Sequence, residues 1–291
     1  LINESNLAIL SDARTTISLY SRFTESLNTY SIQYYNVGTS SNSNPASYTV
    51  ESEKIDLVAI SKIGYTFDGW YDNDTFTGSA VLSIEASSTG NKMLYAKFNA
   101  IEYTIIYLSN GGTNINSELY TIEDALTLSI PPIRPGYSFE GWVSGATTEG
   151  NWESEHTFNG AEALNAGKYG NITLEAQWRI ITYTINIYED NDSANVLLDT
   201  LQYTIETGFT LPSGTPRNGY FLAHYEVTWS QANWASVYGE YEPGFFEAGN
   251  YGNANVKERW EKTLYTISFD TDGGSTIDPT NYYIGVIISI V

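Results

Sequence analysis

Apolar and polar residues alternate through most of the chain, in short stretches that end at turn-forming residues. Tyr103, Ile105 and Tyr107 share one phase of a two-residue period, and Leu174 and Ala176 share another. Side chains alternate between the two faces of a strand, so this period predicts half-buried strands. The 24 tyrosines, together with many threonines, isoleucines and valines, favour strands as well. The pattern predicts a mainly β chain.

One stretch breaks the alternation. Between Trp142 and Asn171 the two-residue period weakens, and the run 161–166 could form one short helical turn. We therefore expect each unit to contain at most one short helix. Asn110-Gly111-Gly112 and Asp272-Gly273-Gly274 follow predicted strands and are expected to form turns that need positive φ.

The strand patterns recur roughly every 75–80 residues as four ordered signatures. The first, Tyr-Thr-Ile, begins at Tyr103, Tyr183 and Tyr265, with a near copy at Tyr30. The second, Tyr-Thr-Val/Ile-Glu, begins at Tyr48, Tyr120 and Tyr203. The third, Gly-Tyr-x-Phe-x-Gly-Trp, occupies 64–70 and 136–142 and is degraded at 219–225. The fourth closes each unit at 93–98, 173–178 and 255–260. Four signatures in a fixed order predict tandem repeats.

The signatures divide the chain into five parts. We expect the closing part of a truncated repeat at 1–24, three whole modules at 25–100, 101–180 and 181–262, and the opening part of a truncated repeat at 263–291. The linkers, near 99–102, 179–182 and 261–263, are short, so we expect restricted motion between neighbours. The chain is interpreted as a cut-out from a longer repeat protein.

The order of the signatures resembles the Listeria–Bacteroides repeat, also called the internalin-type B repeat. The likeness covers nearly all of residues 1–291 and departs from the pattern at Ala223-His224-Tyr225, where Gly-Trp is expected. The resemblance implies small β-grasp-like, α+β modules in an elongated array along large secreted or surface-anchored bacterial proteins. It also implies roles as stalks, adhesion segments or host-contact modules.

The charge of the chain narrows its partners. Thirteen basic and 34 acidic residues give a net charge of −21, which argues against nucleic acid and anionic membranes because phosphate recognition needs basic patches. The chain contains no cysteine, so disulfides and thiolate chemistry are excluded. No stretch is apolar and long enough to span a bilayer. Residues 1–25 lack the plan of a signal peptide, so an export signal is expected upstream.

Catalytic chemistry finds little support. The two histidines, His156 and His224, occupy non-equivalent positions in different repeats, and no nucleophile, phosphate-loop or zinc motif occurs. The acidic runs 72–74, 189–192 and 270–272 offer oxygen ligands that suit calcium, but solvated turns are the favoured interpretation. We expect no catalytic, cofactor-binding or metal-binding residues and no cofactor, and the protein is not expected to be an enzyme.

The tryptophans fall into two groups. Aromatic residues at recurring positions are expected to be buried core anchors, because a module of this size has a small core: Trp70, Phe98, Trp142, Trp178 and Trp260. Three tryptophans do not recur, and they are the candidates for exposed contacts: Trp152, Trp229 and Trp234. A sugar-stacking platform is the alternative for the aromatic set.

Two functions of different classes remain open. The first is a structural stalk or fibre of a secreted or cell-surface bacterial protein, with neighbouring repeats of the same chain as its partners. The second is an adhesin-type module that binds a host protein or glycan. A filament variant follows from the ends: residues 264–291, with Tyr282, Ile284, Val286 and Ile288 on one strand face, would pack head-to-tail against residues 1–23 of another copy.

Overall fold

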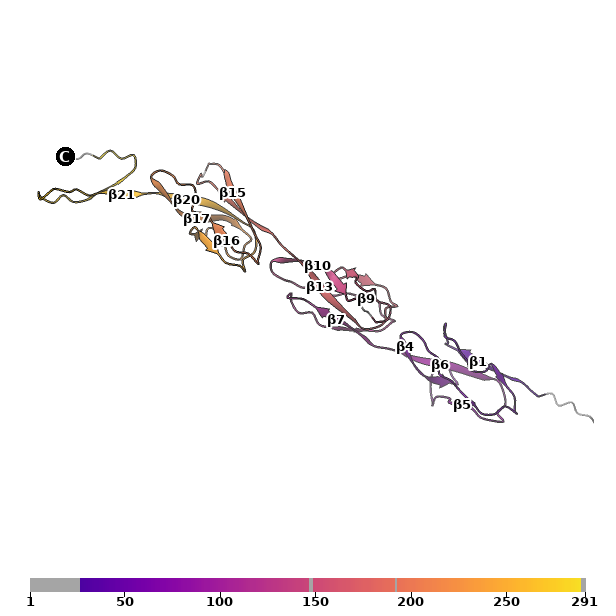
Figure 1. The fold of residues 1–291 in the computed structure, drawn as a ribbon. Helices are drawn as coiled ribbons and strands as arrows, with labels where there is room; N and C mark the ends of the chain where they lie inside the picture. Colours follow the sequence, from indigo (N-terminus) through magenta and orange to yellow (C-terminus); the bar gives the residue numbers. More distant parts are fainter. Residues whose placement is uncertain (1–26, 147–148, 192, 289–291) are drawn as a thin grey trace, which may run out of the picture. The chain divides into compact units, whose positions relative to one another are not determined.

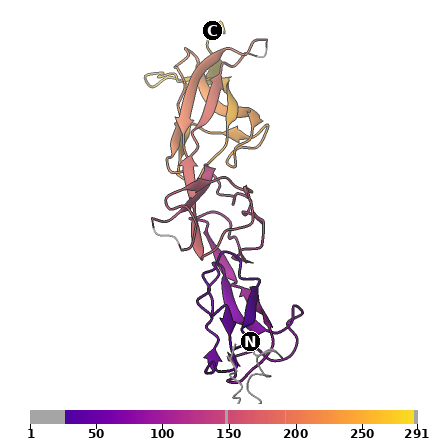
Figure 2. The same ribbon diagram turned by 90° about the vertical axis from the view of Figure 1, so that its right-hand side faces the viewer.

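A computed structural model describes residues 27–146, 149–191 and 193–288. Within these residues the chain forms strands and no helix, so the prediction of a mainly β fold is confirmed. Short strands are joined by long irregular connections (Figures 1 and 2). The chain divides into two compact units, residues 1–101 and 102–291. The expected closing strand within residues 1–23 lies outside the described residues.

The first unit contains one main sheet. Its strands are β1 (Tyr30–Tyr35), β2 (Ser47–Tyr48), β3 (Ile55–Asp56), β4 (Tyr65–Tyr71), β5 (Ser83–Ile84) and β6 (Lys92–Ala100). The sheet has the order β2-β1-β6-β4, in which β1 and β6 are parallel and the outer pairs are antiparallel. The strands β3 and β5 form a separate two-stranded pair.

The second unit repeats this plan twice. The strands of its first half are β7 (Tyr103–Leu108), β8 (Glu118–Tyr120), β9 (Leu126–Thr127), β10 (Tyr137–Ser144), β11 (Thr157–Phe158), β12 (Ala163–Leu164) and β13 (Ile172–Ile180). Those of its second half are β14 (Tyr183–Tyr188), β15 (Leu197–Tyr203), β16 (Phe209–Leu211), β17 (Tyr220–Ser230), β18 (Glu240–Tyr241), β19 (Gly244–Phe246) and β20 (Ala254–Lys262). A final hairpin joins β21 (Leu264–Ile267) to β22 (Thr280–Tyr283).

All three main sheets share one topology. The two sheets of the second unit have the orders β11-β10-β13-β7-β8 and β15-β14-β20-β17-β18, and their central pairs β7/β13 and β14/β20 are parallel. The first and last long strands of each segment are therefore neighbours, as in a β-grasp sheet. Residues 30–100, 103–180 and 183–262, which hold these sheets, are called the first, second and third segments below.

The crossover in each segment is made of short strands. A helical turn at 161–166 was expected, and that expectation is wrong. Ala161 has a φ of 58°, which a right-handed helix does not allow, and Gly160 and Ala161 form a turn. The backbone then enters β12, which pairs with β9 and lets Leu164 pack against the core. The burial of Leu164 on a strand outweighs local helix propensity here.

Each segment has its own apolar core on one face of its sheet. Ile105, Leu174 and Trp142 are fully buried in the second segment. Their counterparts in the third are Ile185, Val256 and Tyr225. The alternation read from the sequence is thus realised: Ile105 and Tyr107 point into the core from β7. The opposite face of each sheet carries polar side chains together with exposed apolar ones, among them Met93, Ile106 and Trp229.

The two glycine turns form as expected, whereas the last strand does not. Asn110 and Gly111 have φ values of 46° and 91°, and Asp272 and Gly273 have values of 43° and 86°. β22 ends at Tyr283, and Ile284 and Gly285 form a turn. The predicted strand face through Val286 and Ile288 is therefore wrong, because the chain leaves the extended conformation at Gly285, where φ is 84°.

Candidate functional site

The tryptophan of the third signature is a core residue, as predicted. Trp70 is 2% exposed and Trp142 is 0% exposed. Each indole Nε1 donates a hydrogen bond to a main-chain oxygen, that of Val58 at 3.0 Å and that of Ser129 at 3.1 Å. The ring is thus buried with its one polar atom satisfied, so it is unavailable for stacking on a ligand.

The closing aromatic residues are less buried than expected. Phe98, Trp178 and Trp260 are only partly buried. Trp178 packs against Phe139 and donates from Nε1 to the main-chain oxygen of Ser109 at 3.0 Å. These residues cover the margin of a core instead of filling its centre, because they lie near the end of the last strand.

The third segment replaces the core tryptophan by Tyr225. This side chain is fully buried, and its hydroxyl donates to the main-chain oxygen of Pro212 at 2.9 Å, as the indole of Trp142 does to Ser129. Burial, together with the negative charge of Glu258, raises the pKa of Tyr225 above its ordinary value. The strand bulge before this position is also kept, between Leu222 and His224.

Two of the three tryptophans predicted to make exposed contacts are not exposed, so the prediction is wrong for them. Trp152 is 5% exposed, and its Nε1 donates to the hydroxyl of Tyr120 at 2.7 Å. Trp234 is half-buried, and its Nε1 donates to the hydroxyl of Tyr203 at 2.9 Å. Trp152 in the second segment and Trp234 in the third are therefore structural counterparts of each other. Only Trp229, 42% exposed, fits the prediction of an exposed contact.

A sequence signal for this pair exists. Both tryptophans follow an asparagine, and each segment later contains Tyr-Gly-Asn, at 169–171 and 251–253. The Oδ1 atoms of Asn151 and Asn233 accept hydrogen bonds from the main-chain nitrogens of Tyr169, at 2.9 Å, and Tyr251, at 2.7 Å. Trp152 and Trp234 are 82 residues apart, as are Trp178 and Trp260, so an alignment on the fourth signature brings the two tryptophans together.

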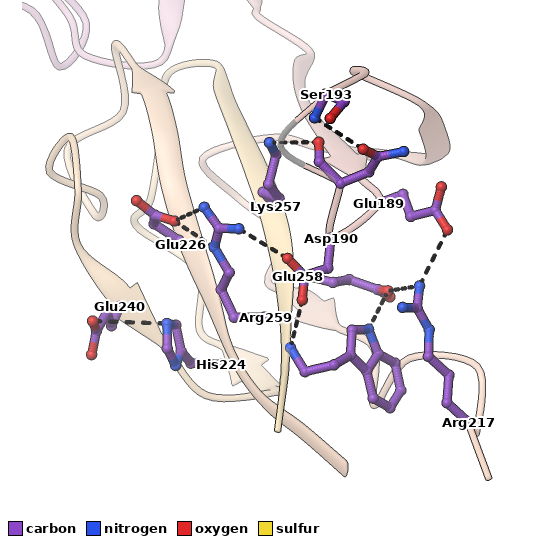
Figure 3. Close-up of polar contacts among 12 residues, drawn as sticks. Glu189, Asp190, Ser193, Arg217, His224, Glu226, Glu240, Lys257, Glu258 and Arg259 are labelled. Atoms are coloured by element: carbon purple, nitrogen blue, oxygen red, sulfur yellow. Dashed lines mark hydrogen bonds and ion pairs between the residues drawn. The ribbon is translucent and has the colours of Figure 1, made fainter. Parts of the chain in front are cut away.

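The third segment carries a cluster of ion pairs around two buried charged residues of β20. Figure 3 shows its members, which come from β17, β18, β20 and the loops that contain Glu189 and Arg217. Lys257 and Glu258 on β20 are buried. By register, Glu258 lies opposite Tyr225 as Ala176 lies opposite Trp142. A carboxylate thus stands where the second segment has a methyl group.

Each charge in this cluster has an opposite partner or a hydrogen bond. Arg259 donates from Nε to Glu226 at 2.6 Å and from Nη1 to Asp190 at 2.9 Å. Glu258 accepts from the Nε1 of Trp260 at 2.8 Å and lies 3.9 Å from Arg217 Nη2. The network ties the loop at 189–191 to the last strand.

This cluster does not have the geometry of a reaction centre. His224 lies 3.8 Å from Glu240 at the outer edge of the sheet, and His156, in another segment, lies 3.2 Å from Glu153 (Figure 3 for His224). Among the described residues, no group of three or more histidine, aspartate or glutamate side chains converges to hold a metal ion. What the arrangement does is fix two loops to a sheet.

The acidic runs serve local structure. Asn73 Oδ1 accepts a hydrogen bond from the main-chain nitrogen of Thr77 at 3.0 Å. Asp190 joins the ion-pair cluster, and Asp270 Oδ1 accepts from the main-chain nitrogen of Asp272 at 3.0 Å. Asp192 lies outside the described residues. These contacts are those of loop-closing side chains.

Each segment has a shallow depression. In the second and third segments it lies on the outer face of the sheet, beside the parallel central strands, whereas in the first it is lined by β5 and the start of β6. Its volume is about 430 Å³ in the first segment, 330 Å³ in the second and 490 Å³ in the third. An asparagine lines each one: Asn91, Asn171 and Asn253. Its Oδ1 accepts from the first long strand, at the main-chain nitrogen of Ser31, Thr104 or Thr184.

The lining differs between segments. The first depression includes Asp72, Glu85 and Lys92. The second includes Glu149 and Glu175. The third is lined by uncharged residues only, namely Thr184, Asn186, Trp229, Asn253 and Asn255.

These features define a tandem array of small β modules with structural, densely hydrogen-bonded interiors. Residues 30–97 and 103–177 match the family model of the Listeria-Bacteroides repeat domain. These two segments are therefore Listeria–Bacteroides repeats, and the resemblance stated from the signatures is confirmed for them. Among the described residues, no helix is long and apolar enough to cross a membrane.

Three curated relatives extend this finding. A "Putative Gly-rich membrane protein" of Evansella cellulosilytica is 26% identical over 253 residues, which are 85% of this chain and 27% of that protein. A "Putative membrane protein" of the same organism is 28% identical over 246 residues, 83% of this chain and 34% of that protein. Internalin H of Listeria monocytogenes is 30% identical over 120 residues, 41% of this chain and 20% of that protein. The chain thus spans about a third of these relatives or less.

Proposed function

We propose that this chain is a spacer segment of a large bacterial protein displayed on the cell exterior, and that it has no catalytic role. Three modules, 25–100, 101–180 and 181–262, set the distance between other parts of that protein. The repeat family, and the repeats shared with Internalin H, support a place in a surface protein. The spacer role is supported by the way in which one repeat meets the next within residues 102–291.

The observation that carries the proposal is a contact that occurs twice. A methyl group placed on Gly136 would lie 2.6 Å from Cβ of Ile205, and one on Gly219 would lie 2.1 Å from Cγ2 of Ile284. Each glycine opens the third signature, and both have a φ of 79°. Each isoleucine lies just after the hairpin of the next repeat, Ile205 after β15 and Ile284 after β22. An isoleucine thus packs on bare backbone, which any side chain on the glycine would prevent.

The same glycines also hold the linkers. The main-chain oxygens of Gly64, Gly136 and Gly219 accept hydrogen bonds at 2.9 Å from the main-chain nitrogens of Ile101, Ile181 and Thr263. In the second unit the hydroxyl of Tyr137 additionally bonds to Glu206. A linker held by hydrogen bonds and by apolar packing resists bending, which is what a spacer requires.

The chain contains no cysteine, so two introduced cysteines are the only sites at which a thiol-reactive spin label attaches. We place labels at the exposed positions Thr173 and Thr228 of the full chain and measure the distance distribution by pulsed electron resonance. The expected result is a narrow distribution that broadens in Ile205→Ser. A control, Ile133→Ser, alters an exposed isoleucine and leaves the distribution narrow. A distribution that is already broad in the parent chain overturns the spacer proposal.

A further inference from the structure

The outer face of the third sheet bears a row of side chains that crosses four strands. Trp229 pairs with Asn255, Asn255 with Asn186, and Asn186 with Thr200. Their neighbours on the strands, Val227, Val256, Ile185 and Ile187, point into the core, so the row faces away from it. Strands lie about 4.8 Å apart, so the row is about 14 Å long, longer than one sugar ring.

The amides of this row are held in fixed orientations. Asn186 Nδ2 donates to Asn255 Oδ1 at 3.0 Å, and Thr200 Oγ1 donates to Asn186 Oδ1 at 3.1 Å. Asn253 Oδ1 accepts from the main-chain nitrogen of Thr184 at 2.8 Å. Because these bonds are internal to the sheet, a molecule that binds here meets side chains whose orientation is already fixed.

Three donors in the depression have no acceptor among residues 27–146, 149–191 and 193–288. They are Nε1 of Trp229, Nδ2 of Asn253 and Nδ2 of Asn255. The equivalent amide in the second segment is satisfied, because Asn171 Nδ2 donates to Glu149 at 3.0 Å. The third depression therefore presents unused donors where the second does not.

The bulge in β17 puts the aromatic ring here. The register shifts between Val227 and Trp229, so Val227 faces the core and Trp229 faces solvent beside Asn255. The first two depressions contain no aromatic residue. An exposed aromatic face beside a few oriented polar groups, in a depression of about 490 Å³, has the composition of a small-molecule site.

We propose that this surface binds an uncharged carbohydrate chain, with one sugar ring stacked on Trp229 and its hydroxyl oxygens accepting hydrogen bonds from Asn253 and Asn255. The five lining residues carry no charge, and the chain as a whole is strongly acidic, so an anionic polysaccharide is disfavoured. This binding is additional to the spacer function and uses none of the residues that connect one repeat to the next.

The experiment uses the full chain labelled with 5-fluorotryptophan and fluorine NMR. The chain has seven tryptophans, and the signal of Trp229 is identified by its loss in Trp229→Phe. The probes are hexasaccharides of β-1,4-glucose, α-1,4-glucose, β-1,4-mannose and β-1,4-N-acetylglucosamine, each at about 10 mM. At least one is expected to shift the Trp229 signal and to leave the buried Trp70 and Trp142 signals in place.

Affinity measurements with the probe that binds then locate the site. Trp229→Ala is expected to weaken binding by about tenfold or more, because the stacking partner is lost. Asn255→Thr, which installs the residue of the second segment, is also expected to weaken it. Thr173→Ala, at the equivalent position of the second segment, is the matched control and leaves binding unchanged. Thermal unfolding verifies that each variant folds.

Three outcomes overturn the proposal. One is the absence of any Trp229 shift with all four probes. Another is binding that Trp229→Ala leaves intact. The last is a concentration-dependent self-association that disappears in Trp229→Ala, which would assign the surface to contact between copies of this chain. None of these outcomes affects the spin-label distances, so the spacer proposal stands or falls separately.

Discussion

The second and third segments have the same topology and bury different chemistry. In the second, Trp142 packs on Tyr107 with Ala176 beside it. In the third, the equivalent places hold Tyr225, Ile187 and Glu258. Two side chains become smaller and one becomes larger, so the volume of the core is roughly kept, as close packing requires. The carboxylate that results contacts Trp260 and Arg217. The equivalent residues of the second segment, Trp178 and Arg134, contact Ser109 and Tyr137 instead.

The comparison teaches that the β-grasp sheet, and not one residue, defines the module. Tyr225 retains the hydrogen bond that Trp142 makes to the preceding crossover. Its strand retains the bulge without the glycine of positive φ that the first two segments use, Gly69 and Gly141. A polar cluster at the margin of the sheet then substitutes for apolar contacts.

The largest expected effect is on the second core. Trp142→Ala removes a fully buried ring and leaves a cavity, at a cost of about 3–5 kcal/mol. That loss is comparable to the whole stability of a small module, so the second segment should unfold while the third stays folded. Urea unfolding followed by NMR of residues in both segments measures this. Equal loss of signals from both segments would contradict independent cores.

Exchanging alanine and glutamate at the equivalent positions Ala176 and Glu258 sharpens the comparison. In the second segment the equivalents of Trp260 and Arg217 are engaged elsewhere, because Trp178 donates to Ser109 and Arg134 stacks on Tyr137. Ala176→Glu therefore buries a charge without a prepared partner and should destabilise that segment by about 3–5 kcal/mol. Glu258→Ala should cost the third segment less, about 1–2 kcal/mol, because Arg217 keeps its contact with Glu189. The denaturant midpoints of the two variants show which substitution destabilises its segment more. A larger loss for Glu258→Ala would show that the ion pairs, not apolar packing, dominate the third core.

The smallest expected effect is at alkaline pH. Burial raises the pKa of Tyr225 and raises that of Tyr203 to about 12, from 10.0 in an exposed tyrosine. The unfolded chain therefore loses these protons first, so stability is complete below pH 10 and falls as pH rises towards 12. Tyr225→Phe should reduce the slope of this fall. The measurement is the melting temperature of the parent chain and of Tyr225→Phe, from neutral pH up to about pH 12. An unchanged slope in the variant would show that Tyr225 does not contribute to the fall in stability.

The strands and core anchors could be predicted because their information is local. The period of two around Ile105 depends only on neighbouring sequence positions, and Trp142 recurs because it belongs to a short motif that is repeated. The pairing of Trp152 with Tyr120 was missed because it links a loop to a distant strand. The cluster around Arg259 depends on which strands become neighbours, since Asp190 and Glu226 come from different elements. The helical turn at 161–166 was wrong because tertiary packing of Leu164 outweighs propensity.

The adjacency of the first and last long strands has a mechanical consequence. In the second segment Ile105 to Leu108 pair in parallel with Ile172 to Glu175. The chain enters at one end of this pair and leaves at the other. A pulling force on the chain therefore loads all the hydrogen bonds of the pair at once, in shear, instead of breaking them one after another. The rate of unfolding under load depends on the barrier to breaking these hydrogen bonds together, and not on equilibrium stability. Each such segment is built to bear tension along its own chain.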